Sequence, residues 1–260
     1  MTILEASGLS KHFGGLKAVE NVNLSVRRGE IVSIIGPNGA GKTTFFNCLT
    51  GIYPLTAGSV RFKDREIANH KPHAITRLGM ARTFQNVRLF AEMTALENVM
   101  VGAYCRTRAG VFHSMFQSPF SRREDHATAQ RALELLKFVG LAAQADSWAR
   151  NLPYGSQRRL EIARALATQP ELLLLDEPAA GMNPQEVGTI TELIRRIRDR
   201  GITVILIEHH MQVVTGISDR IAVLDYGEKI AEGTPQEICC DDRVIEAYLG
   251  KKYEDTPATQ

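Results

Sequence analysis

The residues best suited to chemistry form one short run, Gly36-Pro37-Asn38-Gly39-Ala40-Gly41-Lys42-Thr43. Its glycines let backbone N–H groups converge on an anion without obstruction by a Cβ atom. Its lysine can reach the β- and γ-phosphates of a nucleotide, and the hydroxyl of Thr43 can hold Mg²⁺. The apolar run Ile31–Ile35 predicts a buried strand before this loop, and residues 44–49 predict a helix after it, whose start adds unsatisfied donors. The sequence therefore predicts a Walker A loop that binds a nucleoside triphosphate.

A second group of candidate residues follows the apolar run Leu172–Leu175, which predicts a central parallel strand. Asp176 ends this strand and could bind Mg²⁺ through water, and the carboxylate of Glu177 could polarise an attacking water molecule. Functional groups gather at the carboxyl ends of parallel strands, so the placement favours catalysis. Carboxylates are common at strand ends, however, and the pair alone leaves its role open.

The elements that must position these residues follow from the hydrophobic pattern. Alternation over residues 18–26 and 59–63, with a Gly14-Gly15 turn before the first stretch, predicts a small antiparallel sheet. Further elements are predicted as helices over 94–104, 121–139, 185–198 and 243–249 and strands over 203–207, 221–224 and 229–231. The predicted fold class is α/β, a P-loop NTPase core of mostly parallel sheet flanked by helices, with an antiparallel β subdomain and a helical insertion.

Composition limits the classes of function. The chain has 260 residues and a formal net charge of +2, which is too small to indicate nucleic acid as the main partner. No apolar run approaches the ~20 residues that cross a bilayer, and the first residues lack the pattern of a signal peptide, so we expect a cytoplasmic chain. Its four cysteines have neither disulfide nor zinc spacing, and we expect reduced thiols.

The stretch Leu152-Pro153-Tyr154-Gly155-Ser156, with its place before Asp176, narrows the class of NTPase. Here the sequence resembles the ATPase subunits of ABC transporters over nearly the whole chain, and this stretch lies where that family has its signature motif. The order of motifs also fits the family: Phe13, the Walker A loop, Gln85, the signature, Asp176 and His209. The resemblance implies one ABC ATPase domain over residues 1–250. Its core and β subdomain would cover about 1–84 and 165–250 and its helical subdomain about 86–164, with a polar tail over 251–260.

The resemblance implies roles for single residues. Phe13 would stack on adenine, although core packing is an alternative. Gln85 would touch Mg²⁺ and the attacking water, and His209 would donate to the γ-phosphate, with His210 as a rival. The implied catalytic residues are Lys42, Gln85, Glu177 and His209, and the implied Mg²⁺ ligands are Thr43, Gln85 and Asp176. The implied ATP contacts are Phe13, Gly36, Pro37, Asn38, Gly39, Ala40, Gly41, Lys42, Thr43, Thr44, Gly155 and Ser156.

The resemblance also implies a second ATPase subunit. A helix from about Ser156 to Thr168 would carry the signature and face another subunit's nucleotide. Two chains, identical or closely related, would lie head to tail and close around ATP, and hydrolysis would open them. Three positions depart from the family pattern: Pro153 replaces the signature serine, Asn183 replaces an aspartate after the strand acids, and His210 replaces the acid after the switch histidine.

A narrower resemblance is to the ATPases of branched-chain amino acid importers. It rests on residues 82–90, 152–164 and 177–184, and on the ending Ala247-Tyr248-Leu249-Gly250. It implies transmembrane permease subunits as partners, an indirect link to a periplasmic or extracellular substrate-binding protein, and a place at the cytoplasmic face of the inner membrane. The basic and aromatic residues of 105–123 fit that group, either as a partly buried loop of the helical insertion or as a docking surface.

Two other functions stay open at this point. One is an ABC ATPase for another solute, as in urea-type import or lipid export. The other is a non-transport ABC protein that clamps nucleic acid or ribosomes. Such proteins usually carry two ATPase units or long coiled coils, and this chain shows one unit, no coiled-coil heptads and little net charge. The preferred prediction is therefore an importer ATPase that uses ATP and Mg²⁺ and binds no nucleic acid.

Overall fold

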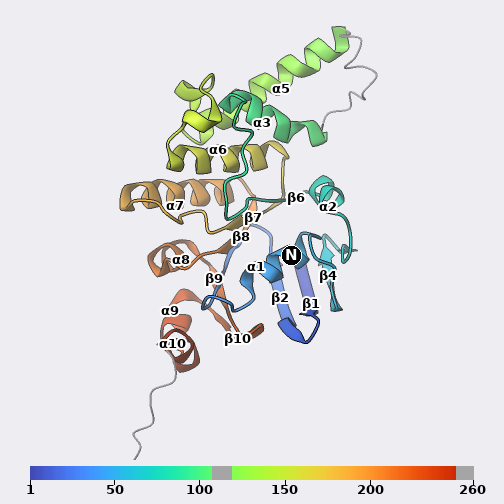
Figure 1. Ribbon diagram of the computed structural model, residues 1–260, viewed down its shortest axis with the longest axis vertical. Coiled ribbons are helices and arrows are strands. Elements are labelled where there is room, and N and C mark those ends of the chain that lie inside the picture. Colours follow the sequence, from blue (N-terminus) through green and yellow to red (C-terminus); the bar gives the residue numbers. More distant parts are fainter. Residues whose placement is uncertain (107–118, 250–260) are drawn as a thin grey trace, which may run out of the picture. The chain divides into compact units, whose positions relative to one another are not determined.

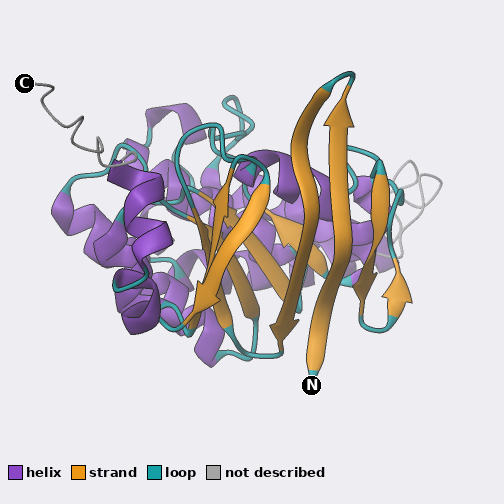
Figure 2. Cartoon of the chain, turned by 90° about the horizontal axis from the view of Figure 1, so that it is seen from below, coloured by secondary structure: helices purple, strands orange, loops and turns teal. Residues whose placement is uncertain are grey.

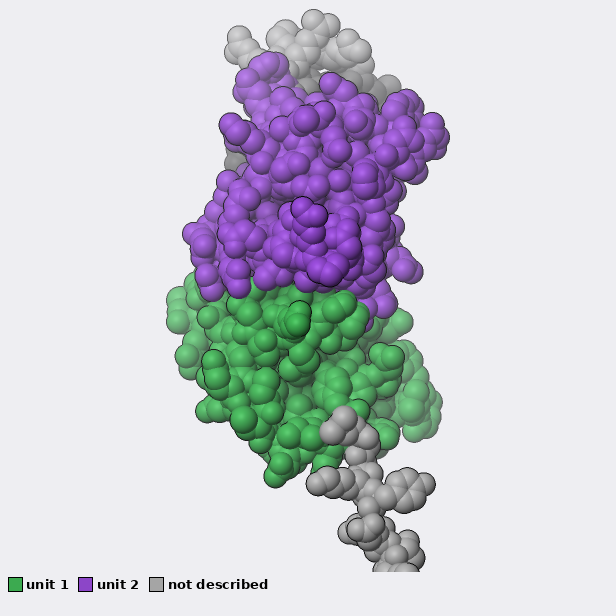
Figure 3. All heavy atoms as spheres, turned by 90° about the vertical axis from the view of Figure 1, so that its left-hand side faces the viewer, with its two compact units in different colours: residues 1–69, 206–260 green, residues 70–205 purple. Residues whose placement is uncertain are grey.

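The structure, a computed structural model, describes residues 1–106 and 119–249. This part of the chain divides into two compact units, which Figure 3 shows in two colours. The first unit holds residues 1–69 together with the chain from 206 onward, and the second holds residues 70–205. The predicted boundaries of a core and a helical subdomain stay a prediction.

An antiparallel sheet of strand order β2-β1-β4-β5 forms one part of the first unit, and its two long strands stand beside the N-terminus in Figure 2. Its strands are β1 (Thr2–Phe13), β2 (Leu16–Arg27), β4 (Ala57–Phe62) and β5 (Arg65–Glu66). In β2 the side chains of Val22, Leu24 and Val26 are buried, and the residues between them are exposed. This alternation buries one face of the sheet. The predicted antiparallel sheet is confirmed, with β1 as the strand that β2 and β4 both pair.

The rest of the first unit is built around the strand that leads to the phosphate loop. Its strands are β3 (Ile31–Ile35), β9 (Arg220–Asp225) and β10 (Glu228–Gly233), in the order β10-β9-β3. β9 runs parallel to β3 and forms an antiparallel hairpin with β10, and these two strands contain the predicted strands 221–224 and 229–231. The helices are α1 (Lys42–Leu49), α8 (Met211–Ile217), α9 (Pro235–Cys239) and α10 (Asp242–Leu249). The three strands share a core with α8, α9 and α10 that contains Ile35, Val214, Ile221, Val223, Ala231, Ile238 and Val244.

The second unit is mainly helical. Its helices are α2 (Pro72–Leu78), α3 (Ala95–Ala103), α5 (Pro119–Phe138), α6 (Tyr154–Ala167) and α7 (Pro184–Asp199), with 3-10 turns η1 (Tyr104–Arg106), η2 (Ala142–Gln144) and η3 (Ala149–Asn151). Its strands are β6 (Met80–Arg82) and β7 (Leu172–Asp176), which run parallel, and the start of β8 (Thr203–Ile207). α3 packs against α5 and α6 (Figure 1). A Cβ atom at Gly102 of α3 would lie 2.2 Å from the carbonyl oxygen of Arg164, so glycine permits this close packing.

The predicted strands over 31–35 and 203–207 have the same bounds in the structure, and every residue in them is buried. The four predicted helices correspond to α3, α5, α7 and α10, and the predicted signature helix to α6. The structure adds the unpredicted short elements α2, β6, α8 and α9. Most of the basic and aromatic stretch 105–123, and the tail 251–260, lie outside the described residues. None of the helices in the described ranges is both long enough and apolar enough to cross a bilayer.

Candidate active site

The phosphate loop joins β3 to α1 in the first unit, and two of its glycines are required by geometry. Gly36 has a φ of 149°, and a Cβ atom there would lie 2.0 Å from the carbonyl oxygen of Leu224. Gly41 has a φ of 96°, and a Cβ atom there would lie 2.4 Å from the carbonyl oxygen of Ala18. The backbone therefore enters and leaves the loop along paths that other residues would obstruct.

Lys42 is the first residue of α1 and is only 8% exposed. Its ammonium group donates hydrogen bonds to the carbonyl oxygens of Gly36 (2.6 Å) and Pro37 (2.7 Å). A buried charge is costly unless it is hydrogen-bonded, so these carbonyls stabilise the lysine and hold its charge at the loop. Gly41, the N-cap of α1, provides no side-chain cap for the first N–H groups, and Thr43 is exposed on the first turn. This arrangement suits an incoming phosphate.

Phe13 ends β1 and has 43% of its surface exposed, which excludes core packing as its role. Its ring meets that of Tyr53 edge to face at a centroid distance of 5.3 Å, and the ammonium group of Lys11 lies 4.9 Å from its centroid. An exposed aromatic face beside a cation suits a planar, negatively charged ligand. Adenine stacking stays a prediction.

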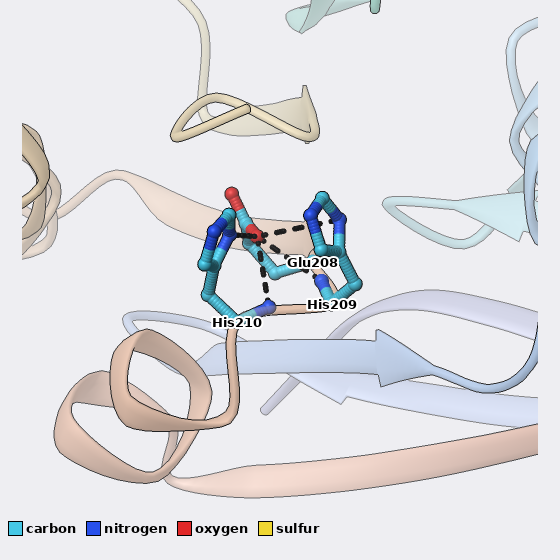
Figure 4. Close-up of side chains that lie close together, drawn as sticks. All are labelled: Glu208, His209 and His210. Atoms are coloured by element: carbon cyan, nitrogen blue, oxygen red, sulfur yellow. Dashed lines mark hydrogen bonds and ion pairs between the residues drawn. The ribbon is translucent and has the colours of Figure 1, made fainter. Parts of the chain in front are cut away.

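Glu208, His209 and His210 follow β8 and are drawn in Figure 4. Glu208 is fully buried, and its Oε2 accepts hydrogen bonds from the backbone N–H groups of His209 (3.0 Å) and His210 (3.3 Å). The same oxygen lies 3.1 Å from Nδ1 of His210 and 4.0 Å from Nδ1 of His209. The carboxylate thus engages His210 more closely, which supports His209 as the residue that reaches a ligand. Because this oxygen already accepts from the backbone N–H groups of both histidines, we expect Glu208 to position His209 and His210.

Asp176, at the end of β7, is buried and ion-paired. Its Oδ2 accepts a hydrogen bond from Nη2 of Arg82 at 2.7 Å, and both side chains are almost fully buried. Within the described part of the chain, its Oδ1 is buried and has no hydrogen-bond partner. A buried carboxylate oxygen rarely lacks a hydrogen-bond partner in a folded protein. A hydrated Mg²⁺ ion would provide a partner for this one. The predicted Mg²⁺ role of Asp176 therefore fits its surroundings.

Gln85 and Glu177 are brought together, as the implied catalytic roles require. Nε2 of Gln85 donates a hydrogen bond to Oε2 of Glu177 at 3.1 Å. Gln85 lies on the exposed loop after β6, and Glu177 directly follows β7. Parallel pairing of β6 and β7 aligns their carboxyl ends and explains the contact between residues far apart in sequence.

The signature residues form the start of α6. Gly155 and Ser156 are buried, and Pro153 at the N-cap provides no side-chain cap. A Cβ atom at Gly155 would lie 2.4 Å from Oε1 of Glu186, so a larger residue would displace that carboxylate. Nη2 of Arg159 donates to Oγ of Ser156 at 3.1 Å, which orients the hydroxyl. Burial lowers the pKa of Arg159, and the nearby charge of Glu186 opposes this effect.

The sequence did not predict two arginines that contact the candidate site residues. Arg82 pairs with Asp176, and Arg158 of α6 donates to the backbone of Phe84 and Gln85. The available signal for Arg82 was its position: it is a basic residue at the end of an apolar strand, three positions before Gln85. The first unit thus positions Phe13, the phosphate loop and His209, and the second positions Gln85, Gly155, Ser156, Asp176 and Glu177.

Comparison with known protein families shows to which family of NTPases the chain belongs. Residues 19–180 match the family described as ABC transporter. The chain belongs to the ABC transporter family. Residues 228–254 also match a family described as branched-chain amino acid ATP-binding cassette transporter. The predicted family and the predicted class of enzyme, an ATPase, are confirmed.

Relatives within the ABC transporter family match almost end to end. The chain is 50% identical over 250 residues to the high-affinity branched-chain amino acid transport ATP-binding protein LivG of Salmonella typhimurium, covering 96% of this chain and 98% of LivG. It is 49% identical, with the same coverage, to the corresponding protein BraF of Pseudomonas aeruginosa. The similarity therefore extends over nearly the whole length of both chains in each pair.

Solved structures of ABC cassettes confirm the predicted fold class. A nucleotide-free ATP-binding cassette from an ABC transporter superposes with a TM-score of 0.85 at 33% identity, covering 96% of this chain and 100% of the cassette. A dimeric cassette in a post-hydrolysis state with ADP and Pi gives a TM-score of 0.76 at 29% identity, covering 90% of this chain and 99% of that one.

Proposed function

We propose that this ABC ATPase powers the import of branched-chain amino acids through partner permease subunits. The observation that carries the proposal is its 50% identity, over 96% of its length, to a branched-chain amino acid transport ATP-binding protein. In this proposal the substrate is selected by membrane subunits and a substrate-binding protein, and this chain contributes the chemistry that drives transport.

The proposed chemistry assigns one task to each group of residues. The phosphate loop and Lys42 bind the β- and γ-phosphates, and Phe13 stacks on adenine. Glu177 orients and deprotonates the attacking water, with Gln85 holding the carboxylate through the 3.1 Å hydrogen bond. His209 donates to the γ-phosphate as charge develops on it.

Mg²⁺ is the metal ion that suits these residues. Thr43, Asp176 and Gln85 would hold it with oxygen ligands, which Mg²⁺ prefers, and the buried Oδ1 of Asp176 supports this assignment. When bound, the ion neutralises charge on the phosphates of ATP.

The proposed assembly contains two ATPase subunits, identical or closely related, arranged head to tail. Each ATP lies between the Walker A loop of one subunit and the start of α6 of the other. The uncapped start of α6 supports this, because its N–H groups and the helix dipole attract anions. The subunits would bind the permeases at the cytoplasmic face of the inner membrane, reach the substrate-binding protein indirectly, and bind no nucleic acid.

Reconstitution tests the transport role. The chain is purified from native membranes with the membrane subunits it carries, placed in proteoliposomes with ATP inside, and assayed for uptake of labelled leucine. We expect uptake that unlabelled isoleucine and valine inhibit and that Lys42→Ala abolishes. Uptake of urea instead, outward movement of lipid, or co-purification of ribosomes or DNA in place of permeases would contradict the proposal.

A further inference from the structure

One ion pair in α6 is almost completely shielded from water. The side chains of Arg158 and Glu161 are 3% and 2% exposed, and Nη1 of Arg158 lies 3.4 Å from Oε2 of Glu161. Burial raises the pKa of Glu161, while the charge of Arg158 opposes this effect. A buried pair is stable only when further hydrogen bonds satisfy both charges, so the other partners of this pair are informative.

Most of those partners belong to the backbone of one loop. Arg158 donates to the carbonyl oxygen of Phe84 at 2.7 Å and, through its other terminal nitrogen, to that of Gln85. Oε1 of Glu161 accepts from the N–H groups of Phe84 (3.5 Å) and Arg88 (3.4 Å). The pair therefore holds the backbone on both sides of Gln85, through donors and acceptors at once.

The same loop is fixed to the end of β7 on its other side. The guanidinium carbons of Arg82 and Arg88 lie 5.2 and 4.3 Å from the ring centroid of Phe84. Arg82 is also the partner of Asp176. The Gln85 side chain reaches Glu177, so the residue is held by its carbonyl oxygen from α6 and by its amide from the strand end.

We propose that the buried Arg158–Glu161 pair positions Gln85 against Glu177 and thereby links the signature helix to the proposed catalytic base. α6 begins at the signature, within one turn of Arg158. Any displacement of α6 that accompanies binding of the other subunit's nucleotide is transmitted through Arg158 to the Gln85 backbone. Arg158 and Glu161 are positioning residues in this account, which rests on the proposed roles of Gln85 and Glu177.

The test removes both charges at once, as Arg158→Met/Glu161→Leu in the full chain. Replacing a buried ion pair with apolar side chains usually preserves stability, whereas removing one partner leaves a buried unpaired charge. We expect a melting temperature close to that of the unmodified chain. We also expect kcat for ATP hydrolysis to fall about tenfold, with KM for ATP within about twofold, because the phosphate loop is untouched.

A matched control is the exposed Glu192–Arg195 pair of α7, which has the same i,i+3 spacing and the same 3.4 Å separation. Glu192→Leu/Arg195→Met is expected to keep kcat. Arg158→Lys is a second test variant if the double variant does not fold. It retains a charge beside Glu161 but lacks the fork that reaches two carbonyls, so we expect the same loss of kcat.

Wild-type kcat in a folded Arg158→Met/Glu161→Leu or Arg158→Lys chain would overturn the inference. Gln85→Ala and Glu177→Gln, assayed in parallel, separate this result from failure of the proposed function. If those two variants lose turnover while the pair variants keep it, only the positioning role fails. If Gln85→Ala and Glu177→Gln keep turnover, the proposed catalytic roles fail with it.

Discussion

Glu177 holds a left-handed backbone conformation, with a φ of 47°, directly after β7. Such a conformation costs a non-glycine residue about 1–3 kcal/mol and persists only where surrounding structure enforces it. Here the parallel strand before it and the hydrogen bond from Gln85 supply that constraint. The strain points to a carboxylate whose direction matters for function.

Glu177→Gln tests the proposed catalytic base. The amide keeps the size of the side chain and an oxygen that can accept from Gln85, but it cannot take a proton from water. We expect ATP affinity, measured by calorimetry, to be unchanged, and phosphate release to fall at least ~100-fold. Glu192→Gln, an exposed change on α7, should leave both unchanged. ATP hydrolysis by the Glu177→Gln chain at a rate close to that of the unmodified chain would show that Glu177 is not the catalytic base.

Cys48 offers a residue-scale test of the first unit. It is 4% exposed, and burial raises its pKa to about 11, with a smaller opposing effect from the charge of Lys11. The thiolate is the reactive form, so at pH 8 only about one Cys48 in 1000 would be reactive. We expect iodoacetamide to modify the exposed Cys239 and Cys240 and to spare Cys48 in the native protein, as read by mass spectrometry. In urea all three should react, and equal native rates for Cys48 and Cys239 would contradict the prediction.

At the scale of elements, the length of a helix or strand and the residues at its ends decide whether the sequence could predict it. β3 and β8 are continuous apolar runs, and each ends at a residue that changes the pattern, Gly36 or Glu208. Helix α8 was missed because it has seven residues and begins after His210, which provides no side-chain cap. Helix α9 has only five residues, too few for periodicity, although Pro235 and the capping box of Thr234 and Glu237 were readable signals.

The candidate site likewise contains parts that the sequence could predict and parts that it could not. The phosphate loop could be predicted because its chemistry is local to eight consecutive residues. The contacts of Arg82 with Asp176 and of Arg158 with Phe84 join residues 94 and 74 positions apart, and spacing gives no signal for them. Asn183 could be recognised as a departure from the family. Only the structure shows that it caps α7 through a reciprocal hydrogen-bond pair with Glu186, a role that asparagine and aspartate fill equally well.

Helix α7 contains a glycine whose replacement by alanine should stabilise the protein. Gly188 lies in its exposed interior, and a Cβ atom there would meet nothing within 4 Å. Gly188→Ala should raise the free energy of unfolding by about 0.5–1 kcal/mol, because alanine loses less conformational entropy in a helix. Urea denaturation followed by circular dichroism measures the change.

Gly201, just after the same helix, is the matched control. A Cβ atom there would also meet open space, but its φ is 84°. Gly201→Ala should therefore lower the free energy of unfolding by about 1 kcal/mol, since only the backbone strain differs. Equal effects of the two substitutions would show that α7 does not have the described helical geometry.

At the scale of the whole molecule, the candidate site residues fall into two sets. The first unit contributes the phosphate loop, and the second contributes the start of α6. In the proposed head-to-tail dimer each ATP would contact Walker A of one chain and the signature of the other, so a chain defective in one set would still supply the other. A solved cassette, 29% identical to this chain, forms a dimer with ADP and Pi. Two defective chains should therefore complement each other.

Complementation can be measured as dimer formation in the Glu177→Gln background, where ATP is retained. Lys42→Ala removes the ammonium group from the phosphate loop, and Gly155→Asp places a negative charge at the start of α6, where a Cβ atom already meets Glu186. We expect each chain alone to stay monomeric with Mg-ATP in light scattering. The mixture should form dimers, weaker than those of the Glu177→Gln parent, because each mixed dimer has one intact shared site. Dimers of either chain alone, or a mixture that stays monomeric while the parent dimerises, would contradict the proposed sharing of each ATP between two chains.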